Sequence, residues 1–437
     1  MQKVLILGAG KSSGFLISYL HQWQGCKLVL ADLSEAQLAP YEGLIETVLL
    51  KPDDLTGRFA LIQDAYLVIS MLPAFMHASV ADDCLKAGVN MATASYISDE
   101  LRTIAPEVHK SGLWFMNECG LDPGLDHMSA MKVFHDIKSA GGSITGFYSY
   151  CGGLVSPESM DNPWGYKFSW NPRNVILAGQ GTARYMEHGE LRFMPYSRLF
   201  ERVREVEFED GSRWDAYPNR DSLSYREVYA LKDVKDMVRG TLRYQGYCDA
   251  WHIFVLMGIT DDSYQFPLQK GHTYKDFASS YLPGSGDDFR KRIKLLRPGG
   301  FSDEAIEKVL WTGLFDAHPI GISEGSPAMI LQHLLEARWK LQPADKDLVL
   351  MQHLIEYEHD GAKKQLICSL RVSGTDAKHT AMAKTVGLPL AITCRLFLEN
   401  KLKQRGVLMP IDKEVYLPVL AELEANGISF SEVSRNL

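Results

Sequence analysis

The residues best suited to acid–base chemistry form one short group, Asp122, Asp126 and His127, within the segment GLDPGLDH. Two carboxylates and an imidazole in one turn could share a proton relay, as general acid–base catalysis requires. The same residue types also suit the start of a helix, because an acid can cap it, proline is favoured at its first position, and a further acid complements the helix dipole. Residue type alone therefore leaves a catalytic and a structural interpretation open.

A second candidate group consists of arginines in conformationally constrained segments of an acidic protein. Arg173 ends a block rich in aromatic residues, Arg220 lies in YPNRDS, and Arg243 lies in RGTLRYQG. A guanidinium can bind a carboxylate through two parallel hydrogen bonds, so these arginines predict a pocket for a ligand with several carboxylates. The alternative is that each arginine is structural and pairs with an acid such as Asp221.

Cys151 is a third candidate, because it ends a predicted strand just before a pair of glycines in SYCGGL. A lone cysteine is usually a small buried hydrophobe. Glycines in a strand, however, mark a place where a ligand or another backbone comes close. A thiol beside the substrate and a buried packing residue both fit this pattern.

The elements that would position these groups begin with a strand–helix–strand unit at the N-terminus. An apolar strand leads into Gly8, Gly10 and Ser13, and a second apolar strand ends at Asp32. This spacing is the dinucleotide-binding fingerprint, in which the glycines form a tight turn against a pyrophosphate and the acid accepts hydrogen bonds from the ribose. The start of the following helix adds unpaired N–H groups for the phosphates.

Apolar strands and helices keep alternating to about residue 121, which predicts an α/β fold with a doubly wound parallel sheet. Its ligand crevice would lie at the carboxyl ends of the strands. The residues at those ends are Gly8–Gly10, Asp32, Ser70–Pro73, Thr93–Tyr96 and Asn117–Gly120.

The pattern changes after about residue 122. Alternating strands are predicted at 146–150, 199–206 and 241–247, which indicates a mainly antiparallel sheet. Helical spacing occupies 287–295, 302–314, 328–341, 346–360 and 379–403.

Composition limits the function further. A chain of 437 residues with a net charge of −8 predicts two or three domains and argues against nucleic acid as a partner. No apolar stretch reaches the roughly 18–20 residues of a membrane span, and the first strand starts too early to leave room for a signal peptide. The 7 cysteines form no C-x-x-C pair, which favours reduced thiols in a cytoplasm. The histidines are scattered, so no metal site is expected.

Six ordered segments resemble saccharopine dehydrogenase of the glutamate-forming type, also called saccharopine reductase, over essentially the whole chain. They are GLDPGLDH (120–127), SYCGGL (149–154), NPWGYKFSWNPR (162–173), YPNRDS (217–222), RGTLRYQG (239–246) and AKTVGLPL (383–390). The resemblance implies three domains. These are a Rossmann-type domain at 1–121 to which about 380–437 returns, an α/β substrate and dimerisation domain at 122–270 and 364–379, and a helical insertion at 271–363.

The resemblance also implies the activity. Such an NAD(P)-dependent oxidoreductase interconverts saccharopine with L-glutamate and 2-aminoadipate 6-semialdehyde in lysine metabolism, by hydride transfer from the C–N carbon and imine hydrolysis. A homodimer is implied as well. Because the amine must lose its proton before hydride leaves the neighbouring carbon, we expect Asp122 or Asp126 to share a proton relay with His127 or Cys151.

Residue by residue, the resemblance divides the site into a cofactor side and a substrate side. On the cofactor side it places Gly8, Ala9, Gly10, Asp32, Met71, Leu72, Pro73 and Thr93, and the spacing adds Ser13. On the substrate side it places Ser95, Tyr96, Asp122, Asp126, Cys151, Arg220, Thr241, Leu242 and Arg243, to which the arginine argument adds Arg173.

The acid at position 32 predicts NAD as the preferred cofactor, although NADP-using members of the family carry a cation or a small polar group there. The 2′-phosphate of NADP would lie beside a carboxylate at a cost on the order of 1–3 kcal/mol, which is roughly tenfold or more in kcat/KM. Two other functions stay open: a non-catalytic dinucleotide-sensing protein, and an imine reductase acting on another amine. The first needs no carboxylate pocket, and a polyamine-forming enzyme would need acidic groups instead of arginines.

Overall fold

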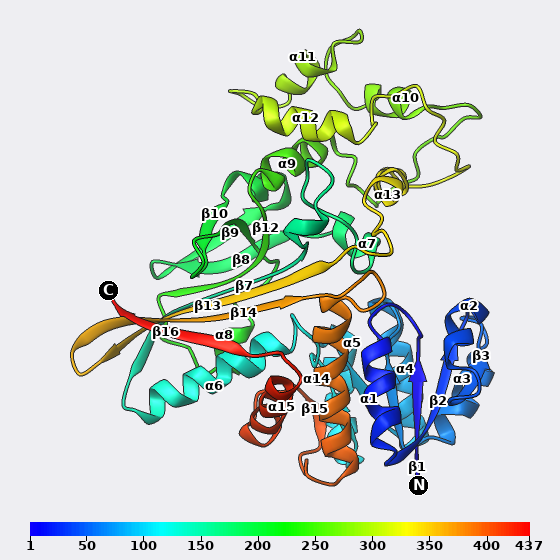
Figure 1. Cartoon of the computed structure of the whole chain (residues 1–437), viewed down its shortest axis with the longest axis vertical. Coiled ribbons are helices and arrows are strands. Elements are labelled where there is room, and N and C mark those ends of the chain that lie inside the picture. Colours follow the sequence, from blue (N-terminus) through cyan, green and yellow to red (C-terminus); the bar gives the residue numbers. More distant parts are fainter. The chain divides into compact units, whose positions relative to one another are not determined.

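The apolar runs of the first third of the chain form one parallel sheet of seven strands (Figure 1). The computed structural model describes all 437 residues and divides into two units, the first at 1–141, 370–374 and 378–430, and the second at 142–369, 375–377 and 431–437. The sheet of the first unit has the order β15-β6-β5-β4-β1-β2-β3. Its strands are β1 (Gln2–Leu7), β2 (Cys26–Asp32), β3 (Glu46–Leu49), β4 (Leu67–Ser70), β5 (Asn90–Thr93), β6 (Trp114–Met116) and β15 (Gly406–Leu408). Strand order reverses beside β1, so the predicted doubly wound sheet is confirmed.

The helices of the first unit alternate with its strands as far as β6, as the sequence pattern predicts. They are α1 (Gly14–Trp23), α2 (Glu35–Leu38), α3 (Leu55–Gln63), α4 (His77–Ala87), α5 (Asp99–Lys110), α6 (Leu125–Ser139), α14 (Ala381–Leu398) and α15 (Lys413–Ala425), with short 3-10 turns at Ala39–Tyr41 and Ala74–Met76. A glycine ends helix α4, as is common at helix C-termini. Gly88 follows the helix in the left-handed conformation, with φ +69°.

Helix α14 lies beside α1 (Figure 1) and is a long apolar helix. Its 18 residues are long and apolar enough to cross a membrane by length and composition, which corrects the expectation that no stretch reaches that length. However, 83% of that window is buried inside the protein, as in a core helix. Phe397 of α14 stacks on Trp114 of β6 with ring centroids 4.1 Å apart.

The second unit is built on a nine-stranded mixed sheet. Its strands are β7 (Ser143–Val155), β8 (Thr182–Glu187), β9 (Glu190–Pro195), β10 (Arg204–Glu207), β11 (Arg213–Pro218), β12 (Asp236–Tyr244), β13 (Asp347–His359), β14 (Ala362–Ser373) and β16 (Phe430–Asn436). The order is β10-β11-β12-β7-β13-β14-β16, with β8 and β9 attached beside β12. Strands β12 and β7 are parallel, while β11 with β12 and β13 with β7 are antiparallel.

All helices of the second unit except α8 contribute side chains to one hydrophobic core that also contains residues of this sheet. The helices of the second unit are α7 (Pro172–Ile176), α8 (Tyr225–Val228), α9 (Tyr247–Met257), α10 (Tyr274–Ser279), α11 (Phe289–Lys294), α12 (Asp303–Trp311) and α13 (Pro327–Arg338), with 3-10 turns at Pro157–Ser159 and Tyr196–Glu201. Side chains such as Phe277, Ile306 and Leu331 belong to the same buried cluster as Tyr148 and Leu350 of the strands. The finer division into a substrate domain and a helical insertion stays a prediction.

Two local predictions are wrong. The segment 346–360, predicted as a helix, is strand β13, whose first seven residues are all buried. A strand covered on both faces shows no alternation, so its apolar run cannot be told from a buried helix by periodicity. The segment 199–206, predicted as a strand, is divided between a 3-10 turn and β10.

Close packing between α1 and α14 predicts a cost for adding one methyl group. A Cβ at Gly387 would lie 2.9 Å from the carbonyl oxygen of Ser12 and 3.1 Å from the amide of Leu16, so the two helices would have to separate. Gly387→Ala should lower the free energy of unfolding by about 1–3 kcal/mol. Gly14→Ala is the matched control, because its Cβ would make only an ordinary contact at 3.7 Å. Urea denaturation of both variants checks this, and a wild-type midpoint for Gly387→Ala would contradict it.

Candidate functional site

The turn after β1 has the shape that a dinucleotide-binding loop requires. Gly8 adopts φ +103°, and a Cβ there would lie 2.9 Å from the carbonyl oxygen of Met71. Gly10 has no atom within 4 Å of its Cβ position, so the space beside it is open to a ligand. Ser13 is buried, and its Oγ donates to the carbonyl oxygen of Gly8 at 2.8 Å. These residues fit a pyrophosphate at the start of α1.

Asp32 closes this loop from the end of β2. Its Oδ2 accepts a hydrogen bond from the amide of Ala9 at 2.7 Å, and its Oδ1 accepts one from the amide of Ser34 at 2.8 Å. The carboxylate therefore holds the glycine turn against the chain that follows β2. The dinucleotide fingerprint predicts this acid only as a hydrogen-bond acceptor for the ribose.

The ends of β4 and β5 meet at a buried histidine that the sequence analysis did not single out. His77, the first residue of α4, lies 2.9 Å through Nδ1 from the Oγ of Ser70 and 2.8 Å through Nε2 from the Oγ of Ser95. Thr93 Oγ1 lies 3.4 Å from the same Nε2. Burial lowers the pKa of His77 to about 4, so the ring is neutral near pH 7. The sequence did contain one sign of this role: His77 comes shortly after Ser70–Pro73, which were predicted to lie at a strand end beside the ligand crevice.

Tyr96 and Asp122 form a hydrogen-bonded pair at the same carboxyl edge of the sheet. The Tyr96 hydroxyl donates to Asp122 Oδ1 at 2.9 Å. The Tyr96 residue is 46% exposed and Asp122 is half-buried, so the pair is accessible to a ligand. The structure thus brings together two residues placed on the substrate side.

Asp126 and His127 lie beneath the loop that carries Asp122. Both side chains are buried, at 1% and 0% exposure. Asp126 Oδ1 accepts a hydrogen bond from the Gly124 amide at 2.6 Å, and His127 Nε2 lies 2.9 Å from a carboxylate oxygen of Glu118. Their observed contacts hold the loop. The predicted cap is wrong, because α6 begins at Leu125 after Gly124, so Asp122 does not cap the helix and Pro123 is not its first residue.

In the second unit, strand register gathers the predicted substrate residues on one face of the sheet. Thr241 of β12 pairs with Cys151 of β7 and with Tyr217 of β11, so the three side chains point to the same face, and Arg243 follows two residues later. Leu242 points to the opposite face and is fully buried. Thr241 Oγ1 donates to Asn219 at 2.6 Å.

Arg243 is buried at 3% exposure and lies among three tyrosine rings. Its guanidinium carbon is 5.3 Å from the ring centres of Tyr166 and Tyr247 and 5.7 Å from that of Tyr217. Nη1 donates to the carbonyl oxygen of Leu242 at 2.9 Å, and the buried Nε has no hydrogen-bond partner. Burial raises the pKa of all three tyrosines, so their hydroxyls are neutral and supply no negative counter-charge.

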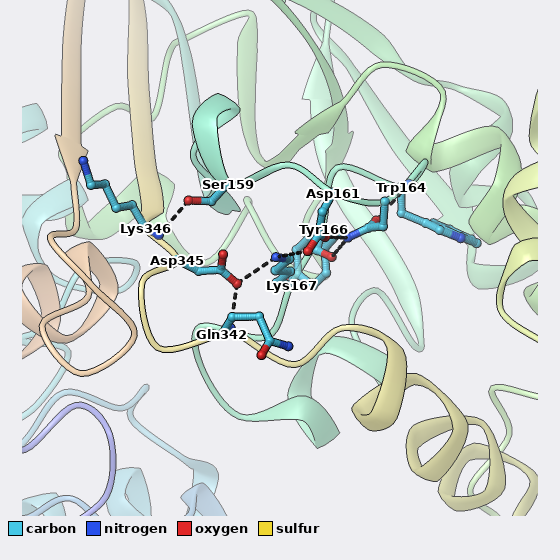
Figure 2. Close-up of polar contacts among 9 residues, drawn as sticks. Ser159, Asp161, Trp164, Tyr166, Lys167, Gln342, Asp345 and Lys346 are labelled. Atoms are coloured by element: carbon cyan, nitrogen blue, oxygen red, sulfur yellow. Dashed lines mark hydrogen bonds and ion pairs between the residues drawn. The ribbon is translucent and has the colours of Figure 1, made fainter.

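The segment that supplies Tyr166 is held by its neighbour Lys167, as Figure 2 shows. The buried Lys167 ammonium lies between Asp161 and Asp345, at 2.7 Å from each. Asn162 also donates to the Tyr166 carbonyl oxygen at 3.1 Å. This explains the polar residues in the aromatic block: they fix one wall of the tyrosine cage around Arg243.

The other two predicted arginines have different surroundings. Arg173 forms an ion pair with Asp262, so its observed partner is an internal acid. Arg220 is exposed, and its guanidinium has no hydrogen bond or ion pair. Arg243 is therefore the buried cation of the three.

Comparison with known proteins identifies the family. Residues 4–116 match the model described as saccharopine dehydrogenase NADP binding domain, and residues 120–428 match the saccharopine dehydrogenase C-terminal domain. The chain belongs to the saccharopine dehydrogenase family. A relative named saccharopine dehydrogenase (NADP(+), L-glutamate-forming) from Schizosaccharomyces pombe is 32% identical over 99% of both chains.

A solved structure and a mammalian protein of the same family are also similar to this chain. The apo structure of saccharopine dehydrogenase (L-Glu forming) from Saccharomyces cerevisiae superposes with a TM-score of 0.88 at 30% identity, covering 100% of both chains. The mitochondrial alpha-aminoadipic semialdehyde synthase of Rattus norvegicus is 32% identical over 99% of this chain, which spans only 48% of that protein. The chain thus corresponds to a whole fungal saccharopine dehydrogenase and to about half of the longer mammalian relative.

The expected preference for NAD is wrong by these comparisons. The family model of the N-terminal domain is NADP-binding, and the fungal relatives are named for NADP(+). The physical reason lies in Asp32, whose two oxygens accept the amides of Ala9 and Ser34. An acid used to hold the loop is a poor guide to which ribose the site accepts.

The loop geometry predicts opposite behaviour for its two glycines. Gly10→Ala places a methyl group in open space, so the melting temperature should stay unchanged while the dissociation constant for NADP rises about tenfold or more, because the methyl group occupies the phosphate position. Gly8→Ala should lower the melting temperature, because its backbone is left-handed and its Cβ meets Met71. Thermal melting and fluorescence titration with NADP check both. Wild-type NADP affinity in Gly10→Ala would rule out this placement of the phosphates.

His77 predicts a loss of stability on acidification. Its pKa in the folded protein is about 4, below its usual 6.5, so between these values the unfolded chain binds a proton that the native state does not. This contribution is fully present above pH 6.5 and is lost as pH falls towards 4. His77→Asn should therefore flatten the fall of unfolding free energy over this range in urea titrations. His188→Asn is the control, because that side chain is 79% exposed, and an equal slope in wild type and His77→Asn would contradict the prediction.

Proposed function

We propose that the chain is an NADP-dependent oxidoreductase that interconverts saccharopine with L-glutamate and 2-aminoadipate 6-semialdehyde. Oxidation converts the C–N bond of the secondary amine to C=N. Water then adds to the carbon, and the C–N bond breaks to give the aldehyde and glutamate. Membership of the saccharopine dehydrogenase family supports this reaction, as do the fungal relatives named for it.

The observation that carries the proposal is the buried, unpaired guanidinium of Arg243. A cation removed from water is costly unless it finds an anion. Here it meets neutral rings and one carbonyl oxygen, and Nε is left without an acceptor. A substrate carboxylate would supply both the missing charge and the missing hydrogen bond, and saccharopine carries several carboxylates.

Residues of the first unit are proposed to hold the cofactor and move the proton. Gly8, Gly10 and Ser13 would bind the pyrophosphate, and the bound nicotinamide supplies hydride acceptance and donation. Asp122 takes the proton of the substrate amine, which frees the nitrogen lone pair for the C=N bond. The Tyr96 hydroxyl orients that carboxylate through its hydrogen bond.

Other roles and properties stay proposals. Ser95, Thr241, Cys151 and Arg220 remain predicted substrate-side residues. We also propose a homodimer through the sheet of the second unit and a cytoplasmic location, and a monomer mass in light scattering would exclude the homodimer.

A polyamine-forming function is not favoured. Homospermidine synthase of Legionella pneumophila, solved with NAD, superposes with a TM-score of 0.58 at 9% identity, which shows a shared fold alone. A polyamine is cationic and would be repelled by the Arg243 guanidinium. A dinucleotide sensor would have no use for that buried charge.

The proposal predicts that Arg243 serves the reaction at a cost in stability. Arg243→Met should keep or raise the melting temperature, because it removes a buried charge that has no carboxylate partner. It should lower kcat/KM for saccharopine by about 30- to 1,000-fold while leaving NADP affinity unchanged. Arg243→Lys should recover only part of the activity, because an ammonium cannot make the two parallel hydrogen bonds.

Arg173→Met is the matched control. It breaks an ion pair with Asp262 and should lower the melting temperature instead. Steady-state kinetics, NADP titration and thermal melting are measured for Arg243→Met, Arg243→Lys and Arg173→Met. Together they distinguish an arginine that binds a substrate carboxylate from one that only stabilises the fold. Near-normal turnover of saccharopine by folded Arg243→Met would exclude the carboxylate role.

A further inference from the structure

Glu118 is a buried acid that contacts two segments, the one that carries Tyr96 and the one that carries Asp122. It follows β6 closely, and its side chain is 1% exposed. Its φ of +54° lies in the left-handed region, which non-glycine residues rarely adopt. Such a backbone persists only where the surrounding contacts hold it, and these sites cluster where function requires them.

The first set of contacts holds Tyr96 from both sides. The Glu118 amide donates to the carbonyl oxygen of Ser95 at 2.9 Å. Its Oε1 accepts a hydrogen bond from the amide of Ile97 at 3.0 Å. One residue thus fixes the backbone immediately before and immediately after Tyr96, which leaves the phenol ring little freedom except about its own bonds.

The second set of contacts reaches the loop of Asp122. Glu118 Oε2 lies 2.9 Å from His127 Nε2, and His127 Nδ1 lies 3.5 Å from Asp126 Oδ2. The other oxygen of Asp126 accepts the Gly124 amide at 2.6 Å, at the end of the turn that contains Asp122. Glu118 is therefore linked to both partners of the 2.9 Å hydrogen bond between Tyr96 and Asp122.

We propose that Glu118 is a positioning residue that sets the Tyr96 hydroxyl on the Asp122 carboxylate and so aligns the proton transfer. The inference rests on the proposed function, in which Asp122 takes the proton of the substrate amine. Glu118 itself is buried and acts through the two segments that it holds. Misplacing a reacting group by about 1 Å can cost about 100-fold in rate, so this alignment matters for kcat more than for binding.

The kinetic test uses Glu118→Gln, which keeps the shape and one acceptor but puts an NH2 group where an oxygen faces His127. We expect kcat for saccharopine to fall roughly 10- to 100-fold, KM and NADP affinity to change little, and the pH profile of kcat to shift. If this variant fails to fold, Glu118→Asp is measured instead, since its shorter side chain cannot span Ile97 and His127 at once.

A double-mutant cycle separates positioning from a general structural role. If Glu118 acts through the pair, adding Glu118→Gln to Tyr96→Phe should lower kcat by less than about threefold further, because the hydrogen bond is already absent. The proposal would be overturned if the fold-loss of kcat in the double variant equalled the product of the losses in the two single variants. Full activity of Tyr96→Phe alone would also overturn it.

Glu422→Gln is the matched control. Glu422 accepts hydrogen bonds from Tyr19 and Arg395 in the same unit, so it also holds a tyrosine hydroxyl, but from α15. It should lower the melting temperature and leave the pH profile of kcat unchanged. An equal shift of that profile in Glu422→Gln would mean that Glu118 has no special role.

Hydrogen exchange tests the positioning without substrate. The amides of 95–97 and 120–124 should exchange faster in folded Glu118→Gln than in wild type, while the peptides of α15 should not. Unchanged exchange in those two segments would overturn the proposal. If wild-type protein does not turn over saccharopine, the proposed function fails, and exchange still decides whether Glu118 holds both segments.

Discussion

The guanidinium of Arg243 is the constraint on which the second unit depends, because it is a charge buried without a carboxylate. Its surroundings come from three places: β11 supplies Tyr217, α9 supplies Tyr247, and the segment held by Lys167 supplies Tyr166. These rings soften the cost of burying the cation through their negative faces, but they remain neutral. The unit therefore keeps an unsatisfied hydrogen-bond donor, Arg243 Nε, in its core. A carboxylate of a bound ligand would accept a hydrogen bond from this donor.

The first unit solves a different problem, which is to hold several polar groups at one edge of a parallel sheet. The carboxyl ends of its strands supply the glycine turn, Asp32, the serines around His77, and Glu118. Each is bonded either to a backbone amide or to another side chain of the same edge. This network keeps the groups in place before any ligand binds, so little rearrangement is needed at the moment of reaction.

The parts of this site that depend on local spacing could be predicted from the sequence, and the parts that depend on distant segments could not. Gly8 and Gly10 are recognisable because one turn between a strand and a helix determines their role. Tyr247 lies four positions after Arg243, but Tyr166 and Tyr217 lie 77 and 26 positions before it, and only the fold brings those two rings to the guanidinium. Strand β13 (Asp347–His359) was mistaken for a helix because it is buried on both faces. Glu118 was inside a predicted strand end, but a lone acid carries no signal until its partners are known.

The most direct test of this account is the oxidation of saccharopine by the purified protein with NADP, following the reduced nicotinamide by absorbance and the products by chromatography. The account predicts one L-glutamate released for each nicotinamide reduced, and no turnover of a polyamine such as homospermidine under the same conditions. Oxidation of the polyamine with saccharopine left unchanged would contradict it, because the buried cation of Arg243 would then have no carboxylate to bind.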